Sequence, residues 1–203
     1  MAIGTYSDLA TAVGNYLERG STLNSAMPTF ISVVEDECNR VLRTMDMEAT
    51  EDIPKTGGIY PLPDDYLEFR QAIALVSPRR PLALVSPEFI EAQYPTREAG
   101  IPAYFSLIAG GIEVVPATDA DVRLVYYARI PGLTQDSPTN WLLSRSPNVY
   151  LFGCLREAAI YIRDSEAITG FESRFQKALA DLIADDKRRR YPRFGARLSM
   201  VTP

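Results

Sequence analysis

The spacing of apolar residues changes near residue 51 and again near residue 140, and these two changes restrict the possible folds of this chain more than any other feature. On either side of them, apolar side chains recur every three or four positions, as they do on amphipathic helices. Between them, Pro and Gly residues separate short runs that favour β-strands. This pattern predicts helices over residues 5–19, 28–48, 147–163 and 166–189, with a β region in the middle of the chain.

The predicted fold class is therefore α+β. We expect an antiparallel four-helix bundle, built from two N-terminal and two C-terminal helices, with an inserted, mainly antiparallel β domain and an extended C-terminal arm. The expected boundaries place residues 1–50 and 140–190 in the bundle, residues 51–139 in the β domain and residues 191–203 in the arm. A chain of 203 residues is long enough for either one large domain or two small ones.

The sequence Asn140-Trp141-Leu142-Leu143 stands where the β region gives way to the third helix. Because two leucines follow Trp141 directly, we expect the tryptophan to be at least partly buried, as a wedge between the bundle and the β domain. The alternative is a tryptophan that is exposed at an interface with another molecule. These four residues are the candidate junction residues.

The last seventeen residues, 187–203, carry six positive charges and no negative one. The rest of the chain holds the remaining 15 Lys+Arg against all 26 Asp+Glu, which is a net charge of −11. A basic, aromatic segment on an acidic body is typical of a docking arm, and Pro192 and Gly195 prevent a continuous helix there. The candidate docking residues are Arg190, Tyr191, Arg193, Phe194, Arg197 and Leu198.

Two other interpretations of this segment stay open. The first is a solvated tail that binds nothing. The second assigns Lys187 and Arg188 to helix electrostatics, because cations near a helix C-terminus face the negative end of the macrodipole. Arg193 and Arg197 lie beyond Pro192, so the second interpretation does not extend to them. A docking arm of this composition would gain its order from its binding partner.

The chain contains no histidine, which excludes His-based catalytic triads, most zinc sites and histidine pH switches. Cys38 and Cys154 lie on apolar helical stripes, so we expect the buried free thiols of an intracellular protein. No glycine-rich phosphate loop is present, and acidic pairs such as Asp64-Asp65 lie in turns or at helix ends. The sequence therefore predicts no catalytic residue, no cofactor and no metal site, and so a protein that is not an enzyme.

No apolar run approaches the roughly 18 residues that a membrane-spanning helix needs, and the N-terminus lacks a signal pattern. We therefore expect a cytoplasmic protein without a membrane partner.

Several short motifs follow one another in a recognisable order. The most specific are Asn140-Trp141-Leu142-Leu143 and Pro147-Asn148-Val149-Tyr150-Leu151, ahead of the third helix. Another is Leu62-Pro63-Asp64-Asp65-Tyr66-Leu67, at the entry into the β region. With residues 5–9, 28–31, 40–43, 80–82, 85–87 and 100–105, this order resembles the head-to-tail adaptor (connector) proteins of short-tailed bacteriophages and their relatives. The resemblance covers about residues 5–185. One departure is Ser146, where the family pattern has a histidine before the proline.

The resemblance implies a structural virion protein that forms a ring, as a dodecamer on the portal protein. Such a ring joins the portal to the tail, extends the DNA channel and helps to retain the packaged genome. Its partners would be the portal, a tail or nozzle protein and other copies of the same chain, with double-stranded DNA passing transiently. The protein would be made in the host cytoplasm and located in the neck or tail of the virion. An acidic body suits the wall of a channel, because it repels phosphate.

The main alternative is a nucleic-acid-binding accessory protein that uses the basic C-terminal tail as a phosphate clamp. In that case Tyr191 and Phe194 would stack on bases. The acidic body argues against it, because DNA binding would have to overcome general repulsion. A salt-dependent DNA shift assay distinguishes the two functions.

Overall fold

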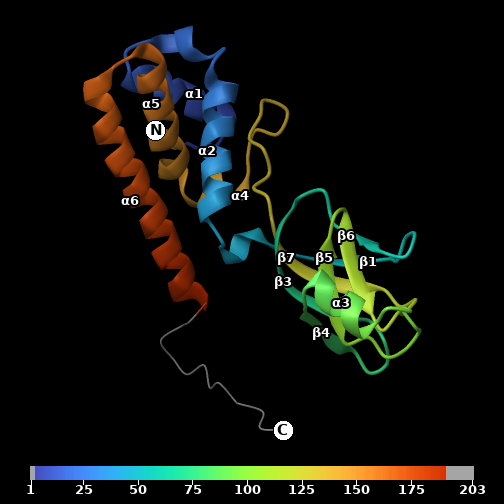
Figure 1. Ribbon diagram of the computed structural model, residues 1–203. Helices are drawn as coiled ribbons and strands as arrows, with labels where there is room; N and C mark the ends of the chain where they lie inside the picture. The colour runs from blue at the N-terminus through green and yellow to red at the C-terminus, as the bar shows by residue number, and fades with distance from the viewer. Residues whose placement is uncertain (1–2, 191–203) are drawn as a thin grey trace. The chain divides into compact units, whose positions relative to one another are not determined.

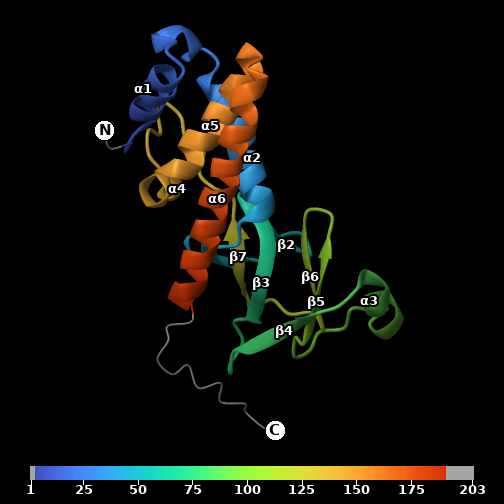
Figure 2. The ribbon, with the colours of Figure 1, turned by 90° about the vertical axis from the view of Figure 1, so that its left-hand side faces the viewer.

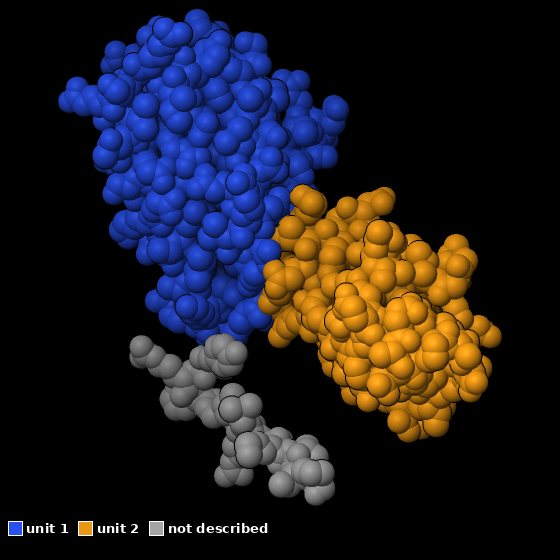
Figure 3. Space-filling view, viewed as in Figure 1, with its two compact units in different colours: residues 1–46, 130–203 blue, residues 47–129 orange. Residues whose placement is uncertain are grey.

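The computed structural model describes residues 3–190 of the chain (Figure 1). The chain divides into two compact units, which Figure 3 shows in different colours. Residues 1–46 and 130–203 form one of them, here called the helical unit, and residues 47–129 form the other, the β unit.

The helical unit contains five of the six α-helices of the described chain. They are α1 (Tyr6–Tyr16), α2 (Met27–Val41), α4 (Trp141–Arg145), α5 (Pro147–Ile162) and α6 (Ser165–Arg190), together with the short 3-10 helix η1 (Gly20–Leu23). A second 3-10 helix, η2 (Met45–Met47), follows α2. The start of α1 is fixed by a capping box, in which Thr5 and Asp8 each accept a hydrogen bond from the backbone N–H of the other.

Helix α5 is the centre of the helical unit, because α1, α2, α4 and α6 all pack against it. Its buried residues occupy every side of the helix rather than a single stripe. Close packing is possible at Gly153, where a Cβ atom would lie only 2.7 Å from the side chain of Val34 on α2. Figure 2 shows α6 beside α5 along most of the length of α5.

The predicted four-helix bundle with an inserted β domain is therefore wrong as an architecture, although the α+β class agrees with the structure. We expected residues 5–19 and 28–48 to pack as an antiparallel pair of helices. Instead, α1 packs mainly on η1 and α5, and α2 packs on α5. The physical reason is that α5 is apolar on all sides, so several helices bury their apolar stripes against it and not against each other.

The predicted ends are accurate for α5 and α6 but not for α2. Helices α5 and α6 begin and end within one residue of the predicted ranges. Helix α2 ends at Val41, seven residues before the predicted end, because Leu42 is extended. Met45 continued the apolar spacing of α2 in the sequence, but it lies in η2.

The β unit contains one seven-stranded sheet with the strand order β1-β7-β3-β4-β5-β6-β2. The strands are β1 (Glu48–Ile53), β2 (Tyr60–Pro61), β3 (Tyr66–Ala74), β4 (Arg80–Leu84), β5 (Tyr104–Ile108), β6 (Gly111–Val115) and β7 (Val122–Ala128). The sheet curls into a nearly closed, barrel-like form (Figure 2). Strands β4 and β5 are parallel and the other neighbours are antiparallel.

Alternation along the strands gives the β unit its core. The alternation of Val122, Leu124 and Tyr126 with their neighbours predicts a strand with one apolar face, and in β7 these three residues are buried while the intervening ones are less so. The pair Gly110-Gly111 between two apolar runs predicts a hairpin, which β5 and β6 form, and Gly110 takes the positive φ of 87° that its turn requires. Helix α3 (Pro87–Gln93) starts at Ser86, whose side chain accepts a hydrogen bond from the N–H of Phe89.

Candidate functional site

The candidate site is the C-terminal end of α6, where the predicted docking arm begins. Arg190 is the last residue of α6. The other predicted docking residues, Tyr191, Arg193, Phe194, Arg197 and Leu198, lie outside the described residues. The structure therefore describes the root of the arm and how it is held.

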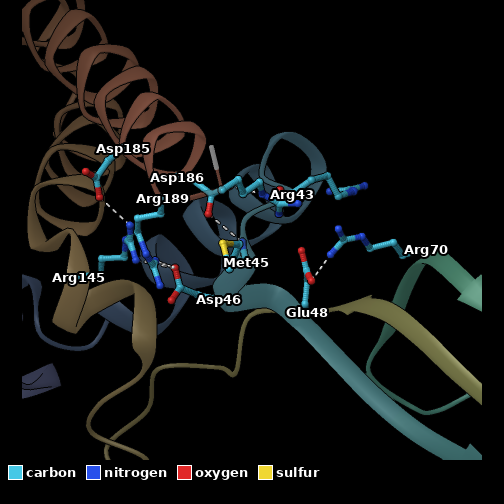
Figure 4. A network of polar contacts seen from close by, with 10 residues as sticks. Arg43, Met45, Asp46, Glu48, Arg70, Arg145, Asp185, Asp186 and Arg189 are labelled. Atoms are coloured by element: carbon cyan, nitrogen blue, oxygen red, sulfur yellow. Dashed lines mark hydrogen bonds and ion pairs between the residues drawn. The ribbon is translucent and has the colours of Figure 1, made fainter. Parts of the chain in front are cut away.

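Ion pairs fix this root to other segments of the helical unit (Figure 4). Arg145 of α4 donates one hydrogen bond to Asp185 of α6 at 2.6 Å and makes an ion pair with Asp46 at 2.9 Å. The same carboxylate oxygen of Asp46 also accepts a hydrogen bond from Arg189 at 2.9 Å. Asp46 therefore connects α4 and α6 through two arginines.

Asp186 provides a second attachment, and it is nearly fully buried. One of its carboxylate oxygens accepts a hydrogen bond from the backbone N–H of Met45 at 2.9 Å, and the other accepts from Arg190 at 2.7 Å. Arg190 also donates to the backbone carbonyl of Arg43 at 3.0 Å. Part of the basic cluster thus holds the last turn of α6 against residues 43–46, before the arm begins.

The predicted junction residues lie at the start of α4. Asn140 is its N-cap: the amide oxygen accepts a hydrogen bond from the N–H of Leu143 at 2.9 Å. Its amide nitrogen donates to the Pro131 carbonyl and to the Tyr150 hydroxyl, both at 2.7 Å. Leu142 and Leu143 are fully buried and Trp141 is partly buried, as predicted. The proposed position of Trp141 as a wedge stays a prediction.

A partly buried network around Glu35 was not predicted. The Tyr150 hydroxyl donates to Oε1 of Glu35 at 2.6 Å, and the N–H of Leu133 donates to the same oxygen at 2.8 Å. Burial raises the pKa of Glu35, and burial together with the neighbouring carboxylate raises the pKa of Tyr150 far above its ordinary range. A signal was present in the sequence, because Glu35 stands four residues after Ile31 and three before Cys38, on the apolar stripe.

A second buried cluster, also missed, surrounds Arg156 of α5. Its guanidinium group contacts Glu37 of α2 and Glu172 of α6, each at 2.7 Å, and Glu157 at 2.8 Å. It also lies over the ring of Phe175, at 4.7 Å from the centroid. Burial opposes the charge of Arg156, but the hydrogen bonds to the three carboxylates outweigh burial and raise its pKa. One arginine therefore links α2, α5 and α6.

The cysteines are both buried and free, as predicted. Burial and neighbouring carboxylates raise the pKa of the Cys38 thiol to about 12, and that of Cys154 rises as well, so both remain protonated at neutral pH. Within residues 3–190, no group of three or more His, Cys, Asp or Glu side chains is arranged to hold a metal ion. None of the helices in this part of the chain is both long and apolar enough to cross a membrane.

A family model described as SU10 adaptor protein matches residues 4–199, which is nearly the whole chain. No curated protein sequence matches the chain.

Proposed function

Because this chain belongs to the SU10 adaptor protein family, a family of phage head-to-tail adaptors, we propose that it forms the ring that joins the portal to the tail. The chain is thus a structural component of the head–tail connection, located in the neck of the virion. In the proposed assembly, the ring is a dodecamer on the portal, extends the DNA channel and helps to retain the packaged genome. A tail or nozzle protein binds its other side.

The family match over residues 4–199 is the observation that carries this proposal. The charge of the chain supports it. Residues 1–186 have a net charge of −11, and a ring multiplies this charge by the number of subunits. A strongly negative channel wall repels DNA phosphate and lets DNA pass without sticking.

In this proposal, the arm holds the ring on the portal by lying along a groove of the portal or of a neighbouring copy, through the candidate docking residues Arg190, Tyr191, Arg193, Phe194, Arg197 and Leu198. The fixed end of α6 supports that role. Asp186 and Asp46 hold the last turn of α6 through Arg190 and Arg189, so the arm starts from an ordered point. An ordered root lowers the entropy that the arm loses on binding.

Deletion of residues 191–203 tests the docking role. The melting temperature should stay nearly unchanged, because the deleted residues lie beyond the described packing of α6. Attachment to purified portal rings, measured by co-sedimentation and by electron microscopy, should be lost. A Lys177→Ala variant, which removes an exposed cation of α6, is the matched control and should bind normally. Normal attachment of the truncated chain would refute the docking role of the arm.

A DNA shift assay tests the alternative of a nucleic-acid-binding accessory protein. Arg189 and Arg190 pair closely with carboxylates, at 2.9 and 2.7 Å, so these two side chains are poorly placed for a phosphate clamp, whereas Arg188 is exposed. We expect no shift of double-stranded DNA at physiological salt. A shift that weakens steeply as salt rises, and that requires residues 187–197, would favour the alternative.

A further inference from the structure

A groove lies on the helical unit between α1, α2 and the segment that precedes α4. It consists of two adjoining hollows of about 590 and 300 Å³, which share the lining residues Tyr6, Asn24 and Gln135. Pro28, Ile31 and Leu133 give the larger hollow an apolar wall.

Glu35 supplies the only charge in the lining of the two hollows. Its Oε1 atom already accepts two hydrogen bonds, from Tyr150 and from Leu133. Within residues 3–190, its Oε2 atom has no hydrogen-bond partner. A Cβ atom on the neighbouring Gly132 would lie 3.9 Å from Oε2, so no side chain at that position covers the oxygen. The groove therefore offers one carboxylate oxygen beside an apolar wall.

These features suit a cationic side chain with an apolar stem. A guanidinium group can donate to a carboxylate while its methylene groups pack on apolar residues. Two other hollows of the helical unit are less suitable for a basic segment. One is lined by Arg43, Lys187 and Arg190 with a single carboxylate, and the other by Arg174 and Lys177 with a single carboxylate. A basic ligand would meet net repulsion in both.

We propose that the Glu35 groove receives an arginine of the C-terminal arm of a neighbouring copy of this chain. The proposal rests on the ring proposed above and names a contact that builds it. The arm supplies Arg193 and Arg197 with Tyr191 and Phe194 beside them, so it carries both the cations and the apolar groups that the groove accepts. Its 13 residues after Arg190 can span about 43 Å when extended.

The groove and the arm root lie on different sides of α2, so in a ring each can face a different neighbour. Glu35 and Glu37 are two residues apart, which is about 200° around a helix, so they point to opposite sides of α2. Glu37 faces Arg156 and, through it, Glu172 of α6. Val41, one turn after Glu37, lines a hollow with Ile183 and Lys187 of α6. The arm therefore starts on one side of α2 and the groove lies on the other, as a head-to-tail ring contact requires.

Cysteine cross-linking between two different chains tests this contact. One full-length chain carries Ser32→Cys at the exposed rim of the groove, and the second carries Arg193→Cys or Arg197→Cys in the arm. The two chains are mixed, assembled on purified portal and mildly oxidised. We expect a disulfide-linked dimer for at least one arm position, because a disulfide needs Cα atoms within about 7 Å of each other. The native cysteines are buried and do not compete.

Val33→Cys is the matched control, because Val33 is exposed and points about 200° away from Glu35 on the same helix. It should give little dimer with either arm cysteine. Glu35→Gln keeps an oxygen that can accept hydrogen bonds from Tyr150 and Leu133 but removes the charge. It should therefore lower the dimer yield about tenfold, whereas the control Asp36→Asn should leave the yield unchanged. With the groove chain unaltered at Glu35, replacing the remaining arm arginine by Gln should also lower the yield.

Equal dimer yields from Ser32→Cys and Val33→Cys would overturn the proposal. So would a yield that Glu35→Gln and the arm substitutions leave unchanged, or a cross-link that forms only within one chain carrying both cysteines. Portal attachment is measured in the same samples. Normal attachment without the dimer refutes the groove contact alone, whereas loss of attachment by all unmodified chains refutes the proposed function.

Discussion

At the scale of single residues, two charged side chains link several segments of the helical unit. Arg156 contacts carboxylates on α2 and α6, and Glu35 accepts hydrogen bonds from α5 and from the segment that precedes α4. Arg156 and Glu37 are 119 residues apart in sequence, and Tyr150 and Glu35 are 115 residues apart. Periodicity identifies Glu35 as a charge on an apolar stripe, but it does not identify a partner on a distant segment, so the members of the two clusters could not be predicted.

Replacing Arg156 with Met should lower the free energy of unfolding by about 1.5–3 kcal/mol, because it leaves the partly buried carboxylates of Glu37 and Glu157 without the hydrogen bonds from their cation. Urea unfolding measured by circular dichroism checks this. Lys177→Ala, which removes an exposed i,i+4 ion pair with Asp181, should cost no more than about 0.5 kcal/mol. Equal losses for the two variants would contradict the assigned role of Arg156.

Glu35 should make part of the stability depend on pH. Burial raises its pKa in the folded protein above the ordinary value of 4.5, so the folded state binds a proton more tightly than the unfolded state. The resulting stabilisation is complete below pH 4.5 and is lost as pH rises through the folded pKa. As pH rises, the wild-type protein should therefore lose unfolding free energy relative to Glu35→Gln. Asp36→Asn is the control, and an identical pH profile for wild type and Glu35→Gln would contradict the prediction.

At the scale of elements, the sequence predicted where helices and strands occur better than how they pack. The predicted ranges of α5 and α6 are accurate because both helices have long, regular apolar spacing. The spacing does not predict α4, because a helix of five residues has too few positions to show a period. The bundle prediction failed because spacing reports which side of a helix is apolar and not which neighbour covers it.

Glycines on two helices provide a test of this packing. Gly153→Ala should destabilise the protein by about 1–3 kcal/mol, because the added Cβ would lie 2.7 Å from Val34 and 3.1 Å from Phe175. Gly170→Ala in α6 should stabilise it by about 0.5–1 kcal/mol, because no atom lies within 4 Å of the new Cβ and alanine favours helix. Thermal unfolding compares them, and a change of the same sign for both would contradict the close packing of α2 on α5.

At the scale of the whole molecule, the distribution of charge is the feature that sequence alone revealed completely. The segregation of six cations into residues 187–203 needs no coordinates to be seen. What the sequence could not reveal is that Arg189 and Arg190 hold the end of α6, because their partners Asp46 and Asp186 meet only in the folded chain.

Attachment to the portal should therefore weaken as salt rises, because exposed charges are screened over about 8 Å at physiological ionic strength. The double variant Arg193→Gln/Arg197→Gln should bind portal more weakly than wild type and should lose much of this salt dependence. Binding measured by co-sedimentation between 50 and 500 mM salt, with Lys177→Ala as the control, checks the prediction. Attachment that is insensitive to salt for every variant would show that the arm binds through its apolar residues instead.

The fixed end of α6 also has a mechanical consequence. In a virion neck, a pull on the arm would act first on the last turn of α6. That turn is held by Asp46 and Arg145 together and by the bond from Asp186 to the Met45 backbone, so the load divides among α4, α6 and residues 43–46. Peeling α6 from its C-terminus would require these bonds to break at nearly the same extension. Under tension, the adaptor would then yield only when several bonds break together, and α6 would not unwind turn by turn from its end.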